Sequence, residues 1–146
     1  MADIHIVSFS SPYKESIIQI RDTVFTIEQG IDAEEDLDGF DESAWHALVI
    51  VDTRPVATGR MLNDGHIGRV AVLKPYRGLG LGAKIIHALI EQARKQQFKR
   101  VYLSSQVQAV GFYTKLGFSL CGAEYDEVGI IHQGMEMALT SPDLTD

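Results

Sequence analysis

The sequence contains very little cysteine and proline. Of its 146 residues, four are prolines and a single one, Cys121, is a cysteine. One cysteine excludes an internal disulfide and a cysteine-rich zinc site. No apolar stretch approaches the roughly 20 residues of a membrane-spanning helix, and the N-terminal MADIHIVSFS lacks a signal-peptide pattern. We therefore expect a cytoplasmic protein with no membrane partner.

Positive charge is also scarce. Lysine and arginine total 13 against 20 aspartates and glutamates, which gives a formal net charge of −7. Because an acidic surface repels polyphosphate, we expect no nucleic-acid partner. The spacing of the five histidines indicates no metal site. The length, with 45% hydrophobic and 23% charged residues, is typical of one globular domain over residues 1–146.

Hydrophobic periodicity predicts a mixed α/β fold with the order β-α-βββ-α-β-α-ββ. The strand patterns lie at 3–9, 46–51, 56–62, 67–73, 100–105, 118–122 and 132–139, and the helical stripes at 13–27, 86–93 and 109–116. We expect the first helix to stop near Gly30, a loop or a short irregular helix at 29–44, and an acidic loop connecting two strands at 123–130. Because a helical crossover joins the strands at 67–73 and 100–105, these two should be parallel.

A glycine-rich turn, Arg77-Gly78-Leu79-Gly80-Leu81-Gly82, lies between a predicted strand and a predicted helix. Alternate glycines allow close approach of a ligand, and the free amides of a helix N-terminus attract anions, so the turn predicts phosphate or pyrophosphate binding. The spacing matches neither the dinucleotide fingerprint GxGxxG nor a Walker loop. The alternative is a turn that only allows helix and strand to pack.

The string VAVLKPYRGLGLGAKIIHALIEQA around this turn resembles the acetyl-CoA signature of the GNAT acetyltransferase superfamily. AVGFYTKLGF resembles its second signature, and RDTVFTIEQGI and AEYDEVGIIHQGMEM are similar to the ElaA-like and glyphosate acetyltransferase-like branch. Together these strings cover most of residues 21–139. The resemblance implies a GNAT-type fold with a splayed parallel strand pair and acetyl-CoA as co-substrate.

The same resemblance implies where acetyl-CoA would bind. In the family, the strand before the turn bulges, and its backbone would pair here with the pantetheine arm through Val70, Ala71 and Val72. A backbone N–H of Val72 or its neighbour would stabilise the oxyanion. The residues that would hold the pyrophosphate are Arg77, Gly78, Gly80, Leu81, Gly82 and Ala83.

Three candidate catalytic residues follow from the resemblance. Tyr113 stands at the position of the family's catalytic tyrosine, and a phenol can protonate the leaving thiolate; the alternative is a packing role, which we assign to Phe112 in the core. His132 in GIIH stands where the glyphosate acetyltransferase-like branch places its catalytic histidine, and is the candidate general base because histidine titrates near neutral pH. The alternative is a histidine that is only hydrogen-bonded at the start of a strand. Glu28 is the competing base or a substrate ligand.

The acceptor is less defined by the sequence. Arg21 and Arg60 are candidate anion ligands, whereas Arg69 would point to the other sheet face unless a bulge intervenes. The acidic segment 34–42 would either attract a cationic amine or form a solvated loop. We expect an N-acetyltransferase for a small-molecule amine. The alternatives are acetylation of a protein lysine or N-terminus and a non-catalytic acyl-CoA sensor, and the resemblance also implies a homodimer.

Overall fold

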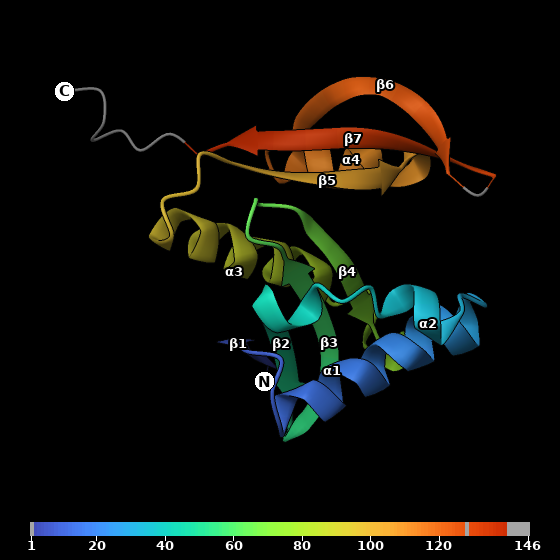
Figure 1. Cartoon of the computed structure of the whole chain (residues 1–146), viewed down its shortest axis with the longest axis vertical. Coiled ribbons are helices and arrows are strands. Elements are labelled where there is room, and N and C mark those ends of the chain that lie inside the picture. The colour runs from blue at the N-terminus through green and yellow to red at the C-terminus, as the bar shows by residue number, and fades with distance from the viewer. Residues whose placement is uncertain (1, 128, 140–146) are drawn as a thin grey trace.

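A computed structural model describes residues 2–127 and 129–139. Its strands form a four-stranded sheet in the order β1-β2-β3-β4 and a three-stranded sheet in the order β5-β7-β6 (Figure 1). The strands are β1 (Ala2–Val7), β2 (Trp45–Val51), β3 (Arg54–Met61), β4 (Ile67–Val72), β5 (Arg100–Gln106), β6 (Ser119–Glu127) and β7 (Ile130–Ala138). The predicted mixed α/β fold and its order of strands are confirmed.

Helical segments follow β1, β4 and β5 in the chain, whereas β2 to β4 and β6 to β7 follow one another directly. The helical segments are α1 (Tyr13–Arg21), the π-helix η1 (Asp22–Glu28), α2 (Ala33–Asp36), α3 (Leu81–Lys95) and α4 (Val110–Lys115), with short 3₁₀ turns η2 (Asp41–Ser43), η3 (Lys74–Tyr76) and η4 (Val107–Ala109). Among the described residues, no helix is long and apolar enough to cross a membrane.

The first sheet lies between α1 and α3. Because alternate side chains of a strand point to opposite faces, Ala47 and Val49 of β2 join the core against α3, whereas Leu48 packs with Ile17 and Ile20 of α1. The predicted stripe of α3 is confirmed, since Ile86, Leu89, Ile90 and Ala93 are all buried. These layers hold β3 and β4 in place below the second sheet.

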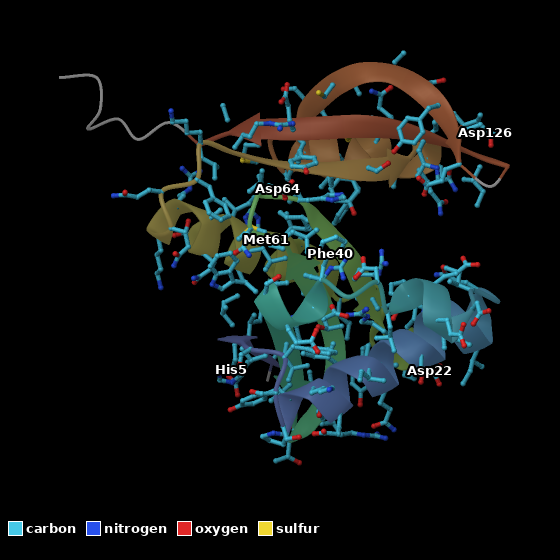
Figure 2. All side chains as sticks on the ribbon, viewed as in Figure 1. His5, Asp22, Phe40, Met61, Asp64 and Asp126 are labelled. Carbon is cyan, nitrogen blue, oxygen red and sulfur yellow. The ribbon has the colours of Figure 1, made fainter. Side chains whose placement is uncertain are left out.

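The expected parallel strand pair is present and splayed. The two strands meet at one parallel bridge between His66 and Tyr102, where the Tyr102 N–H donates to the Gly65 carbonyl at 3.0 Å. Beyond this bridge β5 pairs with β7, in an antiparallel register, and β4 with β3. The labelled Asp64 lies on the turn beside β5 in Figure 2 and accepts a hydrogen bond from the Tyr102 hydroxyl. The strands are therefore joined at one end and open at the other.

A bulge in β4 accompanies the splay. Between the pairs Thr58–Ala71 and Arg60–Gly68, β3 contributes one residue, Gly59, while β4 contributes both Arg69 and Val70. Arg69 adopts a left-handed backbone with φ of 50°, a conformation that glycine takes at the first position of a G1 bulge. The extra residue reorients the Arg69 side chain, so the register expected from simple alternation does not hold there.

Three local expectations are wrong, each for a physical reason. The wider turns of a π-helix rotate the apolar stripe, so that Ile27 is 72% exposed although Ile17, Ile20 and Val24 are buried. Phe112 does not lie in the core and is 44% exposed. The predicted loop at 123–130 is occupied by the end of β6 and the first residue of β7, with a register shift between Cys121 and Tyr125.

Candidate active site

A cleft of about 1150 Å³ opens at the splay. Its walls come from the end of η1 and from α2, from β4 and β5, from α4, and from the hairpin of β6 and β7. In Figure 1 the hairpin and α2 lie on the same side of the molecule, with β4 and β5 between them. Segments that are far apart in the sequence thus converge on one cavity.

The glycine-rich turn leads into α3 and has room for a ligand. Gly78 and Gly80 both have φ of 79°, and a Cβ built at either would meet no atom within 4 Å. The Lys84 N–H donates to the Gly80 carbonyl at the start of α3, and the preceding amides of the first turn have no helical partner. The Leu81 side chain, in contrast, is buried in the core.

Aromatic side chains of α4 lie beside this turn. A Cβ at Gly82 would lie 3.8 Å from the ring of Phe112, which is in edge contact with Tyr113 at a centroid distance of 5.0 Å. Gly82 and Ala83 therefore occupy the junction between the start of α3 and the helix that carries Tyr113. Exposed Phe112 covers this junction instead of packing in the core.

The free edge of β4 faces the open part of the splay. The Leu73 N–H donates to the Val56 carbonyl of β3, and successive residues of a strand direct their backbone groups to opposite edges. The N–H and carbonyl of Val72 therefore point away from β3, and the carbonyl accepts a 2.8 Å hydrogen bond from Arg77 Nε. Ala71, by the same alternation, pairs with Thr58 of β3. Val70 lines the cleft.

Arg77 is held by two partners. Besides the bond to Val72, its terminal nitrogen NH2 lies 2.6 Å from Glu28 Oε1 at the end of η1. Both side chains are partly exposed, at 42% for Arg77 and 28% for Glu28. Glu28 lies at the glycine-rich turn and does not line the cleft that contains Tyr113 and His132.

Tyr113 lines the cleft from α4. Its ring packs edge-on against Phe112 and Phe118 at centroid distances of 5.0 Å and 5.9 Å. Burial raises the pKa of the Tyr113 phenol above its usual value, because the phenolate is disfavoured away from water. The side chain is therefore a protonated donor throughout the neutral range.

His132 lines the cleft from the start of β7. Its Nδ1 lies 2.9 Å from the Ile130 carbonyl. A carbonyl only accepts, so Nδ1 carries the proton of this bond and the neutral ring keeps its lone pair on Nε2. The ring also stacks on Tyr125 of β6 at a centroid distance of 5.9 Å. His132 thus has a defined tautomer and a proton-accepting nitrogen.

An arginine–aspartate network fixes the acidic segment that forms one wall. Arg21, only 1% exposed, pairs with Asp36 at 2.9 Å and with Asp41 at 2.7 Å. Arg60 makes two 2.9 Å bonds to the Asp38 carboxylate and contacts Asp41 at 3.2 Å. These ion pairs, several of them buried, anchor residues 36–41 to α1 and β3.

The network perturbs the carboxyl groups. Hydrogen bonds from Arg60 hold the pKa of Asp38 at about 2. Burial alone would raise the pKa of Asp41, but the hydrogen bonds and charges of Arg21 and Arg60 outweigh it and leave this pKa lowered. All three carboxylates of the network are thus matched by guanidinium groups, and Arg21 and Arg60, expected as anion ligands, are occupied by carboxylates of this chain.

Arg69 completes this arrangement at the cleft surface. Its Nε lies 3.0 Å from Asp36 Oδ1 and its NH2 3.1 Å from Asp38 Oδ2. The β4 bulge gives the side chain this direction. Among the described residues, the ionised side chains that line the cleft are therefore one already paired guanidinium, Arg69, and four carboxylates, those of Asp32, Glu35, Asp36 and Glu127.

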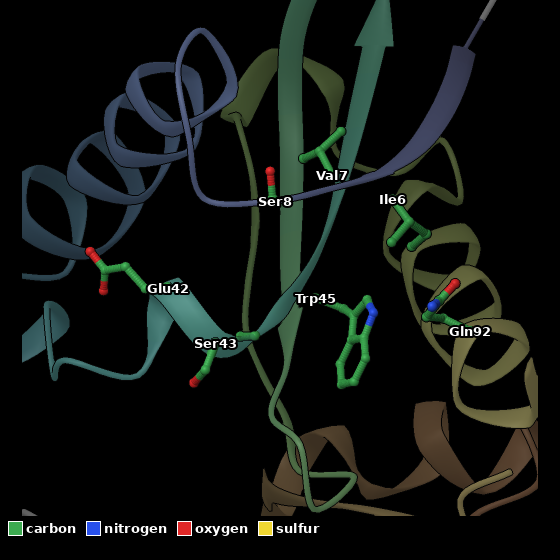
Figure 3. A pocket seen from close by; sticks show the side chains of 8 residues that line it. Ile6, Val7, Ser8, Glu42, Ser43, Trp45 and Gln92 are labelled. Carbon is green, nitrogen blue, oxygen red and sulfur yellow. The ribbon is translucent and has the colours of Figure 1, made fainter. Parts of the chain in front are cut away.

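A second, smaller pocket of about 440 Å³ lies apart from this cleft (Figure 3). The labelled Trp45, Gln92 and Ile6 line it, from β2, α3 and β1. It contains none of the predicted site residues. Within residues 2–127 and 129–139, no group of three or more His, Cys, Asp or Glu is arranged to hold a metal ion.

Sequence reasoning missed two residues beside His132. Ser104 of β5 lines the cleft and its hydroxyl is hydrogen-bonded to the Tyr125 hydroxyl of β6. The acidic composition around Tyr125 indicated a loop, although the residue belongs to a strand. Residues 119–127 do not show a continuous alternation of apolar and polar side chains, because a bulge shifts which residues face each side of the sheet. The strand can be recognised from the sequence only if that shift is allowed for.

Comparison with known proteins agrees with this geometry. Residues 24–139 match the acetyltransferase (GNAT) domain family. The uncharacterized protein YyaT of Bacillus subtilis (strain 168) is 39% identical over 121 residues, which cover 79% of this chain and 82% of YyaT. The uncharacterized N-acetyltransferase YjcF of the same organism is 36% identical over 120 residues, covering 80% of this chain and 86% of YjcF.

Solved structures are similar over nearly the whole chain. Escherichia coli ElaA superposes with a TM-score of 0.84 at 28% identity, covering 94% of this chain and 99% of ElaA. An acyl-CoA N-acyltransferase from Pseudomonas aeruginosa superposes with a TM-score of 0.83 at 27% identity, covering 94% and 100%. The overall fold of this chain is thus shared with these proteins.

Proposed function

The chain belongs to the GNAT acetyltransferase family, and we propose that it transfers the acetyl group of acetyl-CoA to the amine of a small molecule. The observation that carries this proposal is the convergence of Tyr113 and His132 on one cleft at the open end of the β4–β5 splay. One group retains a proton and the other offers a lone pair, as amine acylation requires. Residues of β4, the strand that precedes the glycine-rich turn, line the same cleft.

The chain's residues fit acetyl-CoA. The open space at Gly78 and Gly80 and the free amides at the start of α3 suit a pyrophosphate, with Gly82, Ala83 and the Leu81 amide in the first turn. The free edge of β4 at Val72 suits the amides of a pantetheine arm, continuing past Ala71 and Val70. Bound acetyl-CoA supplies an activated thioester. Arg77 would turn from Glu28 toward the phosphates.

His132 is the proposed general base. An amine reaches the protein mostly as an ammonium ion, which has no lone pair, so the base must first remove a proton. The bond to the Ile130 carbonyl leaves Nε2 of His132 able to accept it. The nitrogen–carbon bond to the acetyl group then forms as the negative charge moves to the carbonyl oxygen, where the Val72 N–H would stabilise it.

Tyr113 is the proposed general acid. As the carbon–sulfur bond breaks, the thiolate accepts the phenolic proton or its hydrogen bond. The attacking nitrogen still carries one proton more than an amide does, and this proton passes to the phenolate, or to water where the phenol has kept its own. The raised pKa of Tyr113 keeps that proton in place until this step. Glu28 is the competing candidate for the base, but its ion pair with Arg77 places it at the glycine-rich turn. The direct transfer needs no covalent intermediate on the protein.

The acceptor proposed is a small amine rather than a protein. The cleft is enclosed by segments from several elements, including the β6–β7 hairpin and the 29–36 wall, and such concave sites suit small molecules. A non-catalytic sensor would require neither an acid nor a base beside the thioester. The proposed homodimer remains an inference from the family resemblance.

The decisive experiment is a coenzyme A release assay with primary amines, amino acids and polyamines. We expect turnover of at least one class, with kcat reduced by His132→Ala and by Tyr113→Phe. Peptide substrates with a lysine or a free N-terminus form a separate arm. Acetyl-CoA binding without turnover of any amine or peptide would contradict catalysis and favour a sensor.

A further inference from the structure

The open face of the second sheet carries an ordered group around His132. Directly paired residues of an antiparallel sheet lie on the same face, so the register places His132 with Tyr125 of β6 and Gln106 of β5. Two residues along β7, Gly134 pairs with Ser104 of β5. Tyr125, His132 and Ser104 therefore all rise from the face that borders the cleft.

Tyr125 links the two outer strands across β7. Its hydroxyl is hydrogen-bonded to the Ser104 hydroxyl, although β7 lies between β6 and β5 in the sheet. The β7 residue that pairs with Ser104 is Gly134, which has no side chain. The bond holds the hydroxyl end of the Tyr125 side chain, and the backbone of β6 holds the other end.

This ring supports one face of the imidazole. The Tyr125 and His132 rings stack with an interplanar angle of 25°. The Nδ1 bond to the Ile130 carbonyl holds one edge of His132, but a single hydrogen bond permits rotation about its axis. The stacked ring removes that freedom. Tyr125 does not itself line the cleft, whereas His132 and Ser104 do.

We propose that Tyr125 is a positioning residue that, through its stack on His132 and its bond to Ser104, orients the imidazole for proton abstraction from the acceptor amine. This inference rests on the proposed function, in which His132 is the base. It extends that function to a residue outside the cleft and assigns the Ser104 hydroxyl a fixed direction. Catalysis is sensitive to such orientation, because small displacements of a reacting group reduce the rate strongly.

Imidazole nitrogen resonances of the full chain, labelled with ¹⁵N, test the orientation directly. We expect the wild type to show His132 as the Nδ1–H tautomer, and Tyr125→Leu to mix the two tautomers. Tyr13→Leu is the matched control, since Tyr13 is 40% exposed and Tyr125 41%. Unchanged His132 resonances in Tyr125→Leu would overturn the proposal, and a thermal melt of each variant identifies any loss of folding.

Kinetics test the consequence. Tyr125→Leu should lower kcat by about 10-fold to 100-fold while acetyl-CoA affinity stays constant. Tyr125→Phe and Ser104→Ala each remove the same hydrogen bond, so each should lower kcat by about fivefold, and the double variant by no more than either alone. If the losses in kcat of the two single variants added up in the double variant, the two side chains would not act through one shared hydrogen bond.

The pH–rate profile separates positioning from a general loss of structure. The charged or titratable groups that line the cleft with His132 are Asp32, Glu35, Asp36, Arg69, Tyr113 and Glu127. Tyr125 of β6 stacks on the His132 ring itself. Tyr125→Leu leaves all the others in place, so a displaced acidic limb would report on the imidazole. If His132→Ala kept the wild-type rate, His132 would not be the general base and the proposed function would lose that part. The ¹⁵N resonances of His132 would still show whether Tyr125 orients the ring.

Discussion

Arg77 and Glu28, from the glycine-rich turn and the end of η1, form an ion pair at 2.6 Å. The same guanidinium donates a hydrogen bond to the Val72 carbonyl, which lies at the open edge of β4. Arg77 thus bridges the two regions proposed to hold the pyrophosphate and the pantetheine arm. Binding of acetyl-CoA would exchange these contacts for contacts to the ligand.

Glu28→Gln should therefore tighten acetyl-CoA binding. Removing the carboxylate frees Arg77 for the phosphates, and the release of a partly exposed ion pair corresponds to about twofold to fivefold in Kd. Isothermal titration of the ligand into both proteins measures it, with Glu15→Gln on α1 as the control. A Kd equal to that of the wild type combined with a large fall in kcat would instead identify Glu28 as the general base.

Gly80→Arg should abolish the rise in melting temperature produced by acetyl-CoA. The residue caps α3 with φ of 79° in open space, so a side chain there fills the place proposed for the pyrophosphate. The left-handed backbone itself costs about 1 kcal/mol for a residue other than glycine.

Gly39→Arg is the matched control for that experiment. Gly39 has φ of 87° and equally open surroundings in the acidic segment. Both variants should lose similar stability without ligand, and only Gly80→Arg should lose the ligand-induced shift. An acetyl-CoA shift that persists in Gly80→Arg would place the pyrophosphate elsewhere.

The sequence predicted the fold closely because its periodic elements are regular. The stripe of α3 and the strands β2 to β4 follow simple 3.6- and 2-residue periods, and the glycine-rich turn lies where they meet. Failures occurred where the backbone departs from those periods. Ile27 rotates outward on a π-helix, Arg69 turns at a bulge, and Tyr125 follows a register shift within β6.

The candidate site was predictable in part for a different reason. Motifs identify Tyr113, His132 and the glycine turn, because those positions depend on local sequence. The fate of Arg21 and Arg60 depends on contacts to Asp36, Asp38 and Asp41, which are distant in the sequence. Ion pairs between residues this far apart follow no periodic pattern in the sequence. The sequence therefore does not distinguish an arginine that is free to bind a ligand from one that is paired with a carboxylate of the same chain.

Tyr113→Phe should lower kcat by about 10²-fold or more while acetyl-CoA affinity changes little. Because burial raises the pKa of Tyr113, the phenol stays protonated as the pH rises through the neutral range. The wild-type rate should therefore show no alkaline decline from this group below about pH 10. Rate profiles of wild type, Tyr113→Phe and the control Tyr13→Phe test both points, and an unchanged kcat would reassign Tyr113 to packing.

Asp41→Asn should destabilise the protein by about 3–5 kcal/mol, because Arg21 and Arg60 would lose a buried counter-charge. Urea denaturation measures this loss, and Asp22→Asn, at an exposed position labelled in Figure 2, is the control. A loss of less than about 1 kcal/mol would show that the other carboxylates compensate.

Acid should weaken the same network. Asp38 and Asp41 have lowered pKa values in the folded state, about 2 for Asp38. Their stabilisation is therefore complete above the unfolded value near 3.9 and is lost as the pH falls toward 2. The free energy of unfolding should decrease between about pH 4 and pH 2, and less steeply in Asp38→Asn. An equal slope in that variant would exclude Asp38 as a source.

The charge of the cleft predicts a preference among acceptors. Among the described residues, Arg69 is the one guanidinium that lines the cleft, and it is paired with Asp36 and Asp38. The carboxylates of Asp32, Glu35 and Glu127 also line the cleft. An acceptor that carries a carboxylate meets net negative charge. An amino acid carboxamide, nearly identical in shape to the free amino acid, should therefore have a roughly tenfold higher kcat/KM. Because salt screens exposed charges, the ratio should shrink between about 0.05 M and 0.5 M sodium chloride. At low salt, Glu127→Gln should also lower the ratio of kcat/KM for the carboxamide to kcat/KM for the free acid. A ratio below one would contradict the prediction, because the free acid would then need a cationic partner, and Arg69 is already paired with carboxylates.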